Sequence, residues 1–247
     1  MVNLQLILGI GKGAPFWIIT LFSFYDYLKK GGDKRKHIFY AFFFFSIGFA
    51  AAAILNVVLV PGMSESDKVI SGYLAYIFDC CNLIGLFWLF VFLTDFVDYM
   101  KKYIKYAAVH LIISLIIILA LPVDIVPADG DVPMLERQGI KSIMLLSFWF
   151  LYWSIIAYQF WKHSGLMTRN VAIRRSQMMS IGAVFAIIAY IFIIISATQE
   201  GSARAILFFA SNISAALCGI VLYLGFCAPA WLKAMWRRSD REKISES

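Results

Sequence analysis

The chain has 247 residues, of which 62% are hydrophobic and 15% are charged, and its formal net charge is +7. A soluble domain is about half apolar and a quarter charged, so this composition excludes a water-soluble globule. The four cysteines all fall in apolar segments, which predicts packing residues rather than a disulfide framework. They are Cys80, Cys81, Cys218 and Cys227.

Seven apolar segments are each long enough to cross a bilayer as a helix, which takes about 20 residues. None alternates with a period of two, and a chain in hydrocarbon must satisfy its own backbone, so helices are expected. The first segment lacks the basic start and the cleavage motif of a signal peptide, and we interpret it as a span. The segments are 4–28, 38–60, 69–96, 103–121, 140–161, 177–198 and 205–232.

These segments predict an all-α integral membrane fold, a seven-transmembrane helix bundle formed by residues 1–232. A basic juxtamembrane tail of residues 233–247 follows the bundle and is expected to continue as a charged helix. The run of four phenylalanines at 42–45 is expected to face lipid. The loop at 122–139 contains three prolines, which predicts turns rather than a cation site.

Basic residues are distributed unequally between the two sets of connections. Seventeen lysines and arginines fall in the connections near 29–37, 97–105 and 162–176 and in the C-terminal tail, whereas four fall in the opposite set. The positive-inside rule then predicts the N-terminus outside and the C-terminus in the cytoplasm. A basic face beside a membrane attracts anionic lipid headgroups, so membrane lipids are expected partners and nucleic acid is not.

Two ionisable residues lie deep in the predicted spans. Lys12 is about eight residues from the outer end of the first span, and Asp79 is about ten residues from the outer end of the third. A helix rises about 1.5 Å per residue, so both lie at a similar depth. Charges in hydrocarbon face the bundle interior and pair with one another. The sequence therefore predicts a buried ion pair between Lys12 and Asp79.

Other polar and aromatic residues reach the same layer and are expected to line a cavity that opens outward. A cavity with apolar walls and a few convergent polar groups is the usual form of a small-molecule site. Interhelical hydrogen bonding is the structural alternative for the same residues. The predicted ligand-binding residues are Lys12, Asn56, Asp79, Asn82, Trp149, Trp153, Tyr190 and Asn212.

Several kinds of chemistry are not expected. A retinal Schiff base needs a lysine in the last helix, and 205–232 contains none. His37, His110 and His163 are too scattered for a metal or haem site, so no cofactor or metal is predicted. His110 is interpreted as a packed bundle histidine, with proton sensing as the alternative. No nucleophile, base and orienting group assemble, so the chain is not predicted to be an enzyme.

The end of the last span reads Leu224-Gly225-Phe226, then Pro229, then a Trp-Leu-Lys-x-x-Trp-Arg run at 231–237. It resembles the exit from the N-terminal seven-transmembrane sensor regions of bacterial histidine kinases and related signalling proteins. The segments 93–98 and 158–175 are similar to other parts of those regions. The resemblance implies a sensory domain in a bacterial inner membrane, acting through a cytoplasmic signalling domain, a separate partner or a homodimer.

The sequence thus predicts a receptor-like membrane domain that binds a small molecule, ion or lipid within the bundle and relays a change to the cytoplasm. The alternative is a small transporter or channel that uses Lys12, Asp79 and His110 as a polar path. The odd number of spans and the lack of an internal repeat disfavour that alternative.

Overall fold

A computed structural model describes the backbone of residues 2–59, 64–126, 134–137, 139–196, 199 and 201–245, and the side chains of 7–59, 64–123, 139–196, 199 and 201–237. Within these residues, seven helices are long and apolar enough to cross a membrane. The elements are α1 (Val2–Lys30), α2 (Asp33–Val58), α3 (Glu65–Thr94), a 3₁₀ turn η1 (Asp98–Tyr103), α4 (Ile104–Ala120), β1 (Val123–Val126), β2 (Met134–Arg137), α5 (Gly139–Ser164), α6 (Asn170–Ser196), α7 (Gly201–Cys227) and α8 (Ala230–Ser245).

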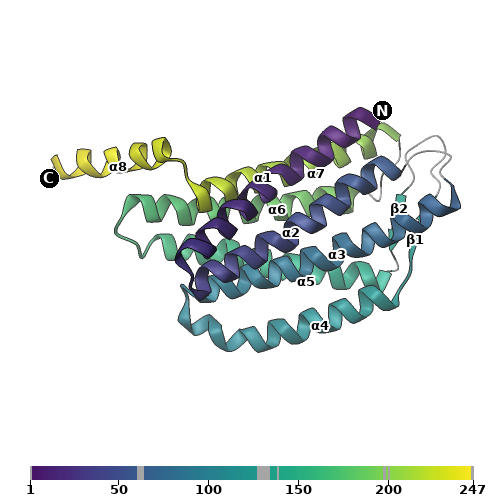
Figure 1. The fold of residues 1–247 in the computed structure, drawn as a ribbon, viewed down its shortest axis with the longest axis horizontal. Coiled ribbons are helices and arrows are strands. Elements are labelled where there is room, and N and C mark those ends of the chain that lie inside the picture. Colours follow the sequence, from purple (N-terminus) through teal and green to yellow (C-terminus); the bar gives the residue numbers. More distant parts are fainter. Residues whose placement is uncertain are drawn as a thin grey trace.

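Six of the described long helices close into a ring, and α4 lies outside it. The ring runs α1, α2, α3, α5, α6 and α7, and α7 packs back onto α1. Among the described residues, the peripheral helix α4 packs mainly against α3, α5 and its own flanking turn η1, and it lies along one edge of the bundle (Figure 1). Because α2 separates α1 from α3 in this ring, side chains of equal depth on α1 and α3 need not meet.

The helix ends follow from local sequence. Ser64 caps α3: its hydroxyl accepts the Asp67 N–H, and the Asp67 carboxylate accepts the Ser64 N–H. Between α1 and α2 the chain reverses through Gly31 and Gly32, whose φ angles of 60° and 94° suit glycine. After α7, Pro229 precedes α8, which projects beyond the bundle and ends far from the N-terminus (Figure 1).

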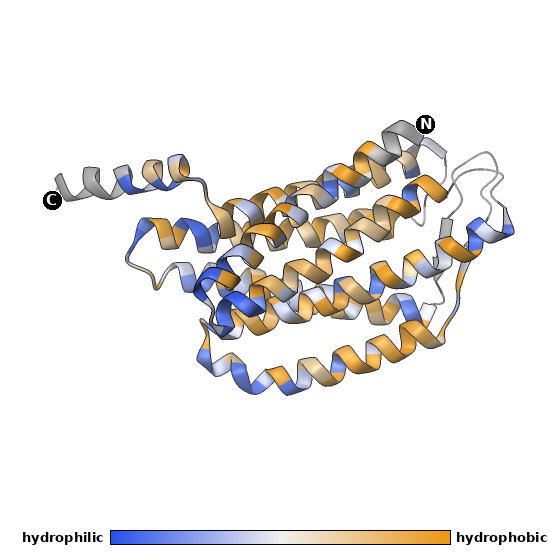
Figure 2. Ribbon diagram, viewed as in Figure 1, coloured by the Kyte–Doolittle hydropathy of each residue, from blue (hydrophilic) through white to orange (hydrophobic). Residues whose placement is uncertain are grey.

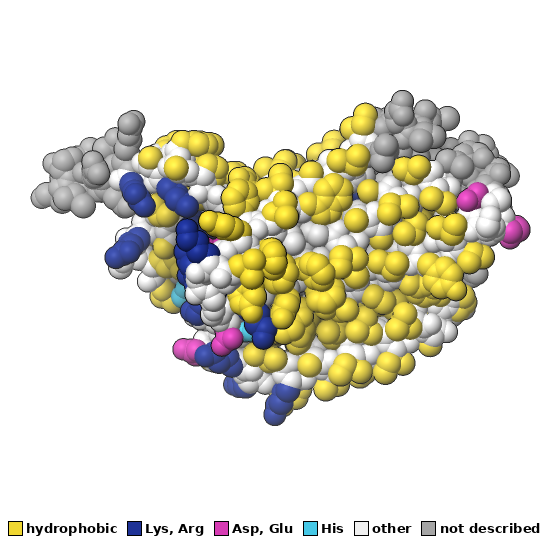
Figure 3. Space-filling model, viewed as in Figure 1, with side chains coloured by type: hydrophobic (Ala, Val, Ile, Leu, Met, Phe, Trp, Pro, Cys, Tyr) yellow, Lys and Arg dark blue, Asp and Glu magenta, His cyan; other side chains and the backbone are white. Residues whose placement is uncertain are grey.

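Polarity divides the molecule along its long axis. The middle of the helices is apolar, whereas hydrophilic residues gather at the end that holds the α1–α2 and α5–α6 connections (Figure 2). Lysine and arginine side chains cluster at this end, which we call the basic end, and the visible acidic side chains of α3 lie at the opposite end (Figure 3). The apolar band between the two ends is the surface expected of a chain surrounded by lipid.

The structure corrects the interpretation of the phenylalanine run. Phe42 and Phe45 are buried in the ring, with exposed fractions of 0% and 1%, whereas Phe43 remains 40% exposed. Phe16 stacks on Phe49 with ring centroids 4.4 Å apart, and Phe45 stacks on Trp153 at 6.0 Å. Four consecutive residues on a helix point in four directions, so the run could not face lipid as a block.

The predicted spans and tail agree closely with the structure, and the α4–α5 connection differs from its prediction. The seven predicted spans are confirmed as helices over their described residues, except that the last of them ends at Cys227 and α8 begins at Ala230, three residues before the predicted tail. The α4–α5 connection, however, is not only turns: β1 and β2 pair antiparallel, with Val123 opposite Arg137 and Val126 opposite Met134. A hairpin satisfies the backbone of this segment internally, which suits a loop close to the membrane. The central residues 127–133, with two of the loop's prolines, lie outside the described residues.

Helices approach one another closely at glycines. A Cβ atom placed on Gly219 of α7 would lie 2.8 Å from the Phe16 ring and 2.9 Å from Pro15 on α1. On Gly182 of α6 it would lie 2.8 Å from Leu222 of α7, and on Gly85 of α3 it would lie 3.0 Å from the carbonyl oxygen of Ala41 on α2. Small residues at contacts let helices in lipid gain packing energy that apolar burial alone cannot supply.

We expect Gly219→Ala to lower the free energy of unfolding by about 1–3 kcal/mol, because the added methyl group meets a Phe16 ring that Phe42, Phe45 and Phe49 hold in place. Denaturation in detergent micelles measures the change. The control is Gly72→Ala on α3, whose Cβ would meet nothing within 4 Å and should leave stability unchanged or raised. Equal effects of both substitutions would contradict the packing role of Gly219.

Candidate functional site

Lys12 of α1 is paired, though not with the predicted partner. Its Nζ donates a hydrogen bond of 2.9 Å to Oδ1 of Asn212 on α7, and the Asn212 amide donates to the carbonyl of Phe208. Among the described residues Lys12 forms no ion pair with Asp79, so that prediction is wrong. Depth was estimated correctly, since Lys12 and Asn212 do share a layer, but Lys12 faces α7 rather than α3.

Asn82 and Asn56, the other two asparagines of the predicted site, lie at different helix contacts. Asn82 of α3 is fully buried; it donates to the Phe78 carbonyl at 2.7 Å and lies against Gly48 of α2. Its Oδ1 has no hydrogen-bond partner among the described residues. Asn56 of α2 is half-buried, and its amide lies close to Gly9 of α1. Both residues therefore sit at interhelical contacts, where they also serve packing.

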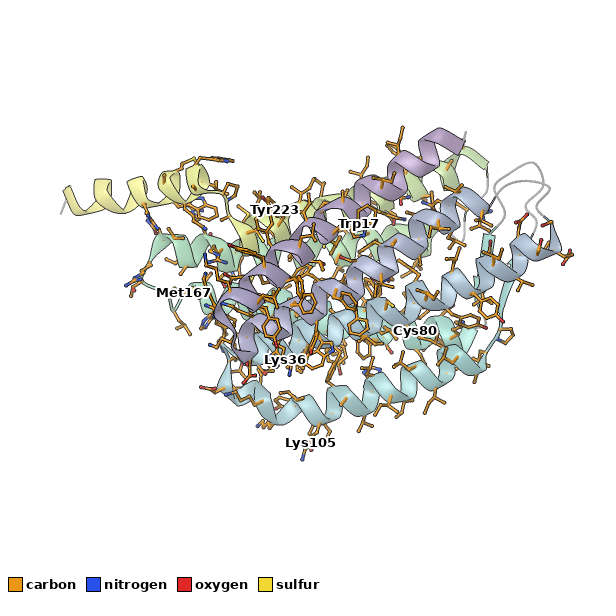
Figure 4. All side chains as sticks on the ribbon, viewed as in Figure 1. Trp17, Lys36, Cys80, Lys105, Met167 and Tyr223 are labelled. Carbon is orange, nitrogen blue, oxygen red and sulfur yellow. The ribbon has the colours of Figure 1, made fainter. Side chains whose placement is uncertain are left out.

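Asp79 is buried midway along α3, and the sequence analysis missed a second buried cationic residue, on α5. Lys141 of α5 has an exposed fraction of 0%; its Nζ lies 4.0 Å from the Tyr76 ring centroid and 3.3 Å from the Leu121 carbonyl oxygen. Tyr76 precedes Asp79 by almost one turn and donates to the same carbonyl. Cys80, which Figure 4 labels, follows Asp79 on α3.

Lys141, Tyr76 and the Leu121 carbonyl bring three elements together: α3, the end of α4 and the start of α5. Lys141 comes shortly after Arg137, Gln138 and Gly139, so the sequence analysis counted it with the outer connections. The neighbouring sequence nevertheless favours burial of the Lys141 side chain. Ile140 and Ile143 lie close to it, and a lysine inside an apolar run is expected to bury its stem. A buried ammonium over an aromatic ring is stabilised by the ring quadrupole, which gives Tyr76 a role in holding Lys141.

The aromatic residues of the prediction do come together, between α5 and α6. Trp149 and Tyr190 have ring centroids 3.8 Å apart, and Trp153 lies next to Trp149 at 6.3 Å. With Phe150 and Ile187 they line a gap of about 120 Å³ that is too narrow for a water molecule. Both tryptophans are buried, and neither indole N–H has a hydrogen-bond partner among the described residues. We call this set the indole gap.

The structure thus separates the predicted layer into distinct groups. Trp149, Trp153 and Tyr190 share the indole gap, and Lys12 and Asn212 share a hydrogen bond, whereas Asn56, Asn82 and Asp79 lie at other helix contacts. His110, on the peripheral helix α4, packs against Phe148 and Tyr152 of α5 at 5.0 and 5.8 Å. Of these groups, the indole gap combines apolar walls with unused donors, the properties of a small-molecule site.

The fold defines the class of protein: a multi-pass α-helical membrane protein with seven helices, among the described residues, that are long and apolar enough to cross the bilayer. No protein-family model and no curated protein sequence matches the chain.

We expect Asn212→Leu to destabilise the protein by about 1 kcal/mol, because it leaves the Lys12 ammonium without its acceptor. The same substitution made in a Lys12→Met background should cost less, since no charge then needs that acceptor. A double-mutant cycle on the unfolding free energy in micelles measures the coupling. As a control, Asn82→Leu should cost the same in both backgrounds; additive effects of Lys12→Met and Asn212→Leu would refute the pairing.

Proposed function

We propose that this chain is a receptor-like sensory membrane domain whose ligand enters the indole gap between α5 and α6. The observation that carries the proposal is the pair of buried indole N–H groups on Trp149 and Trp153, for which the described part of the chain offers no hydrogen-bond partner. A buried donor without an acceptor costs about 1–3 kcal/mol. A ligand that brings an acceptor into the gap recovers that free energy on binding.

The lining of the gap indicates the chemical class of the ligand. All five lining residues are aromatic or aliphatic, and no described charged residue is among them. A small apolar molecule with one or two carbonyl oxygens matches apolar walls with indole donors. Phe150, Ile187 and Tyr190 are half-buried, so the gap borders the lipid-facing surface, and a ligand dissolved in the bilayer has the shortest route to it.

The closed state of the gap supports a sensory role. The space of about 120 Å³ admits no water, so a ligand binds only if α5 and α6 or their side chains move apart. Packed helix interfaces shift between discrete arrangements rather than deforming continuously. A ligand that binds only the open arrangement shifts the population toward it.

Helix α6 offers a direct path from the gap to the basic end. Arg175 of α6 donates from Nε to the Gly225 carbonyl and from Nη2 to the Phe226 carbonyl, both at 2.7 Å, and so holds the last turn of α7. Leu232 and Trp236 of α8 form a small apolar cluster into which Val171 and Met178 of α6 pack. A displacement of α6 would therefore move both the end of α7 and α8.

The same proposal includes the topology, with the N-terminus outside, α8 in the cytoplasm, and a bacterial inner membrane as the location. The clustering of lysines and arginines at the basic end supports this orientation. The exit motif at 224–237, which resembles that of bacterial sensor regions, supports a signalling output through α8 and a cytoplasmic domain or partner. The projection of α8 away from the bundle is compatible with that output (Figure 1).

We expect 2-nonanone and menadione, which carry carbonyl acceptors, to raise the thermal unfolding temperature of the purified protein more than nonane does, because binding to the folded state adds stability. Replacing both donors in a Trp149→Phe/Trp153→Phe variant keeps the aromatic walls and should abolish this difference. The matched control is Trp161→Phe on the same helix, where the side chain is 57% exposed and outside the gap.

An unchanged carbonyl preference in the double variant, or no preference in the wild-type protein, would exclude the indole gap as the ligand site. Solute flux through liposomes that contain the purified protein would instead favour the transporter alternative.

Topology is tested by labelling intact bacterial cells with a membrane-impermeant maleimide. We expect Ser66→Cys, exposed at the start of α3, to react, and Asp33→Cys, exposed at the start of α2, to react only after the membrane is permeabilised. The unsubstituted protein reports the background from the four native cysteines, which lie within the helices. The reverse pattern would overturn the assignment of the two faces.

A further inference from the structure

A pocket of about 460 Å³ lies at the basic end, separate from the indole gap. It is lined by residues from just before α6 through its first turns and by one residue of α8. The lining residues are Arg169, Val171, Ala172, Arg175 and Arg237. Its position is beside the α5–α6 connection, in which Figure 4 labels Met167.

The charge of this pocket is strongly one-sided. Three of its five described lining residues are arginines, and no acidic residue is among these five. Arg175 is held by two main-chain carbonyls, which leave its charge uncompensated, and neither Arg169 nor Arg237 forms an ion pair with a described residue. Three guanidinium groups around one space repel each other unless an anion occupies it.

The start of α6 adds to the positive electrostatic potential of this pocket. The first N–H groups of a helix have no partner within the helix and carry the positive end of its dipole. Helix α6 has 27 residues and no acidic residue in its first turn, so no described side chain of that turn neutralises this end. Val171 and Ala172 of that turn line the pocket, and although the N–H groups of Ala172 and Ile173 donate to the Arg169 carbonyl, the positive end of the helix dipole lies next to the arginines.

We propose that this pocket binds a phosphate group, carried by an acidic phospholipid headgroup or by a soluble phosphate compound. Guanidinium groups bind phosphate oxygens with paired, charge-assisted hydrogen bonds, and basic pockets at the ends of membrane helices are suited to acidic headgroups. The pocket is of the size that small ligands occupy in proteins. The proposal does not depend on a ligand in the indole gap.

Occupancy of this pocket would also position α8. Arg237 belongs to α8, whereas Arg169 and Arg175 belong to the α6 side, so docking of α8 brings like charges together. The apolar contacts of Leu232 and Trp236 favour the docked arrangement against that repulsion. A phosphate between the arginines removes the repulsion and adds attraction, so it stabilises α8 on α6.

Two binding measurements on the purified full chain test the proposal and distinguish the sources of phosphate. Calorimetric titration of inorganic pyrophosphate into protein in phosphatidylcholine nanodiscs reports a soluble ligand. Native mass spectrometry of protein from mixed phosphatidylcholine and phosphatidylglycerol nanodiscs reports retained acidic lipid. We expect the variant Arg169→Gln/Arg237→Gln to weaken pyrophosphate binding, or retention of the lipid, by at least about tenfold.

The control variant Arg174→Gln/Lys233→Gln removes the same charge from α6 and α8 outside the pocket. Arg174 is exposed, and neither residue lines the pocket. Binding of pyrophosphate alone identifies a soluble ligand, and retention of phosphatidylglycerol alone identifies a headgroup. Equal losses in the two double variants, or no loss in the pocket variant, would overturn the site.

Hydrogen exchange of the α8 amides then tests whether a ligand in the pocket stabilises α8 on α6. The bound ligand should slow exchange around Leu232 and Trp236 in the wild-type protein and leave the pocket variant unchanged. Binding without slower exchange would overturn the role in docking α8, and the circular dichroism of each variant confirms that the helices are intact.

Discussion

Lipid is as apolar as the side chains that cover these helices, so burial of apolar surface gives little net attraction between one helix and the next. What holds the ring together must therefore be close packing and interhelical hydrogen bonds. The chain supplies both: glycines at the α1–α7, α6–α7 and α2–α3 contacts let the backbones approach, and ammonium and hydroxyl groups form hydrogen bonds across the α1–α7, α6–α7 and α5–α6 contacts. Examples are Ser180 to the Ala157 carbonyl and Ser211 to the Ala189 carbonyl, at 2.7 and 2.8 Å.

The same constraint separates the parts of the molecule that can move from those that hold it together. The contacts of α7 with α1 and α6 combine glycines with the Lys12–Asn212 hydrogen bond on one side and the Arg175 hydrogen bonds on the other, which hold α7 on both sides. The α5–α6 contact contains the indole gap, where the indole N–H groups of Trp149 and Trp153 have no partner among the described residues. Nearer the start of α6, the hydroxyls of Ser176 and Ser180 donate to carbonyls of α5. Under the proposed function, a displacement of α6 would reach α7 through the Arg175 hydrogen bonds and α8 through the contacts of Leu232 and Trp236.

Much of the fold follows from the sequence alone. Composition and segment length predict seven membrane helices, because lipid imposes the same demand on every span. Depth is also predictable, since it depends only on helical rise, and it correctly placed Lys12 and Asn212 in one layer. The direction in which a side chain points around its helix depends on which helices are neighbours. That information is not local, and its lack made the Lys12–Asp79 pair wrong and made the phenylalanine run seem uniformly exposed.

The candidate site was predictable to a similar degree. Trp149, Trp153 and Tyr190 were recognised from their depth and chemistry, and they do meet. The burial of Lys141 was missed because it lies at the junction of a polar loop and an apolar run, where only the folded position of α4 decides the environment. The pocket lined by Arg169, Arg175 and Arg237 joins residues more than sixty positions apart, and no local pattern marks it.

The peripheral position of α4 has a consequence for the membrane itself. With 17 residues, α4 is about 26 Å long, whereas an average hydrocarbon core is about 30 Å thick. Basic and aromatic residues of the turn before it, Lys101, Lys102 and Tyr103, sit where the apolar stretch begins. With η1 the candidate span is Asp98–Ala120, 23 residues, and little of it is buried, so a change in bilayer thickness would act more directly on this edge of the bundle than on the helices of the ring.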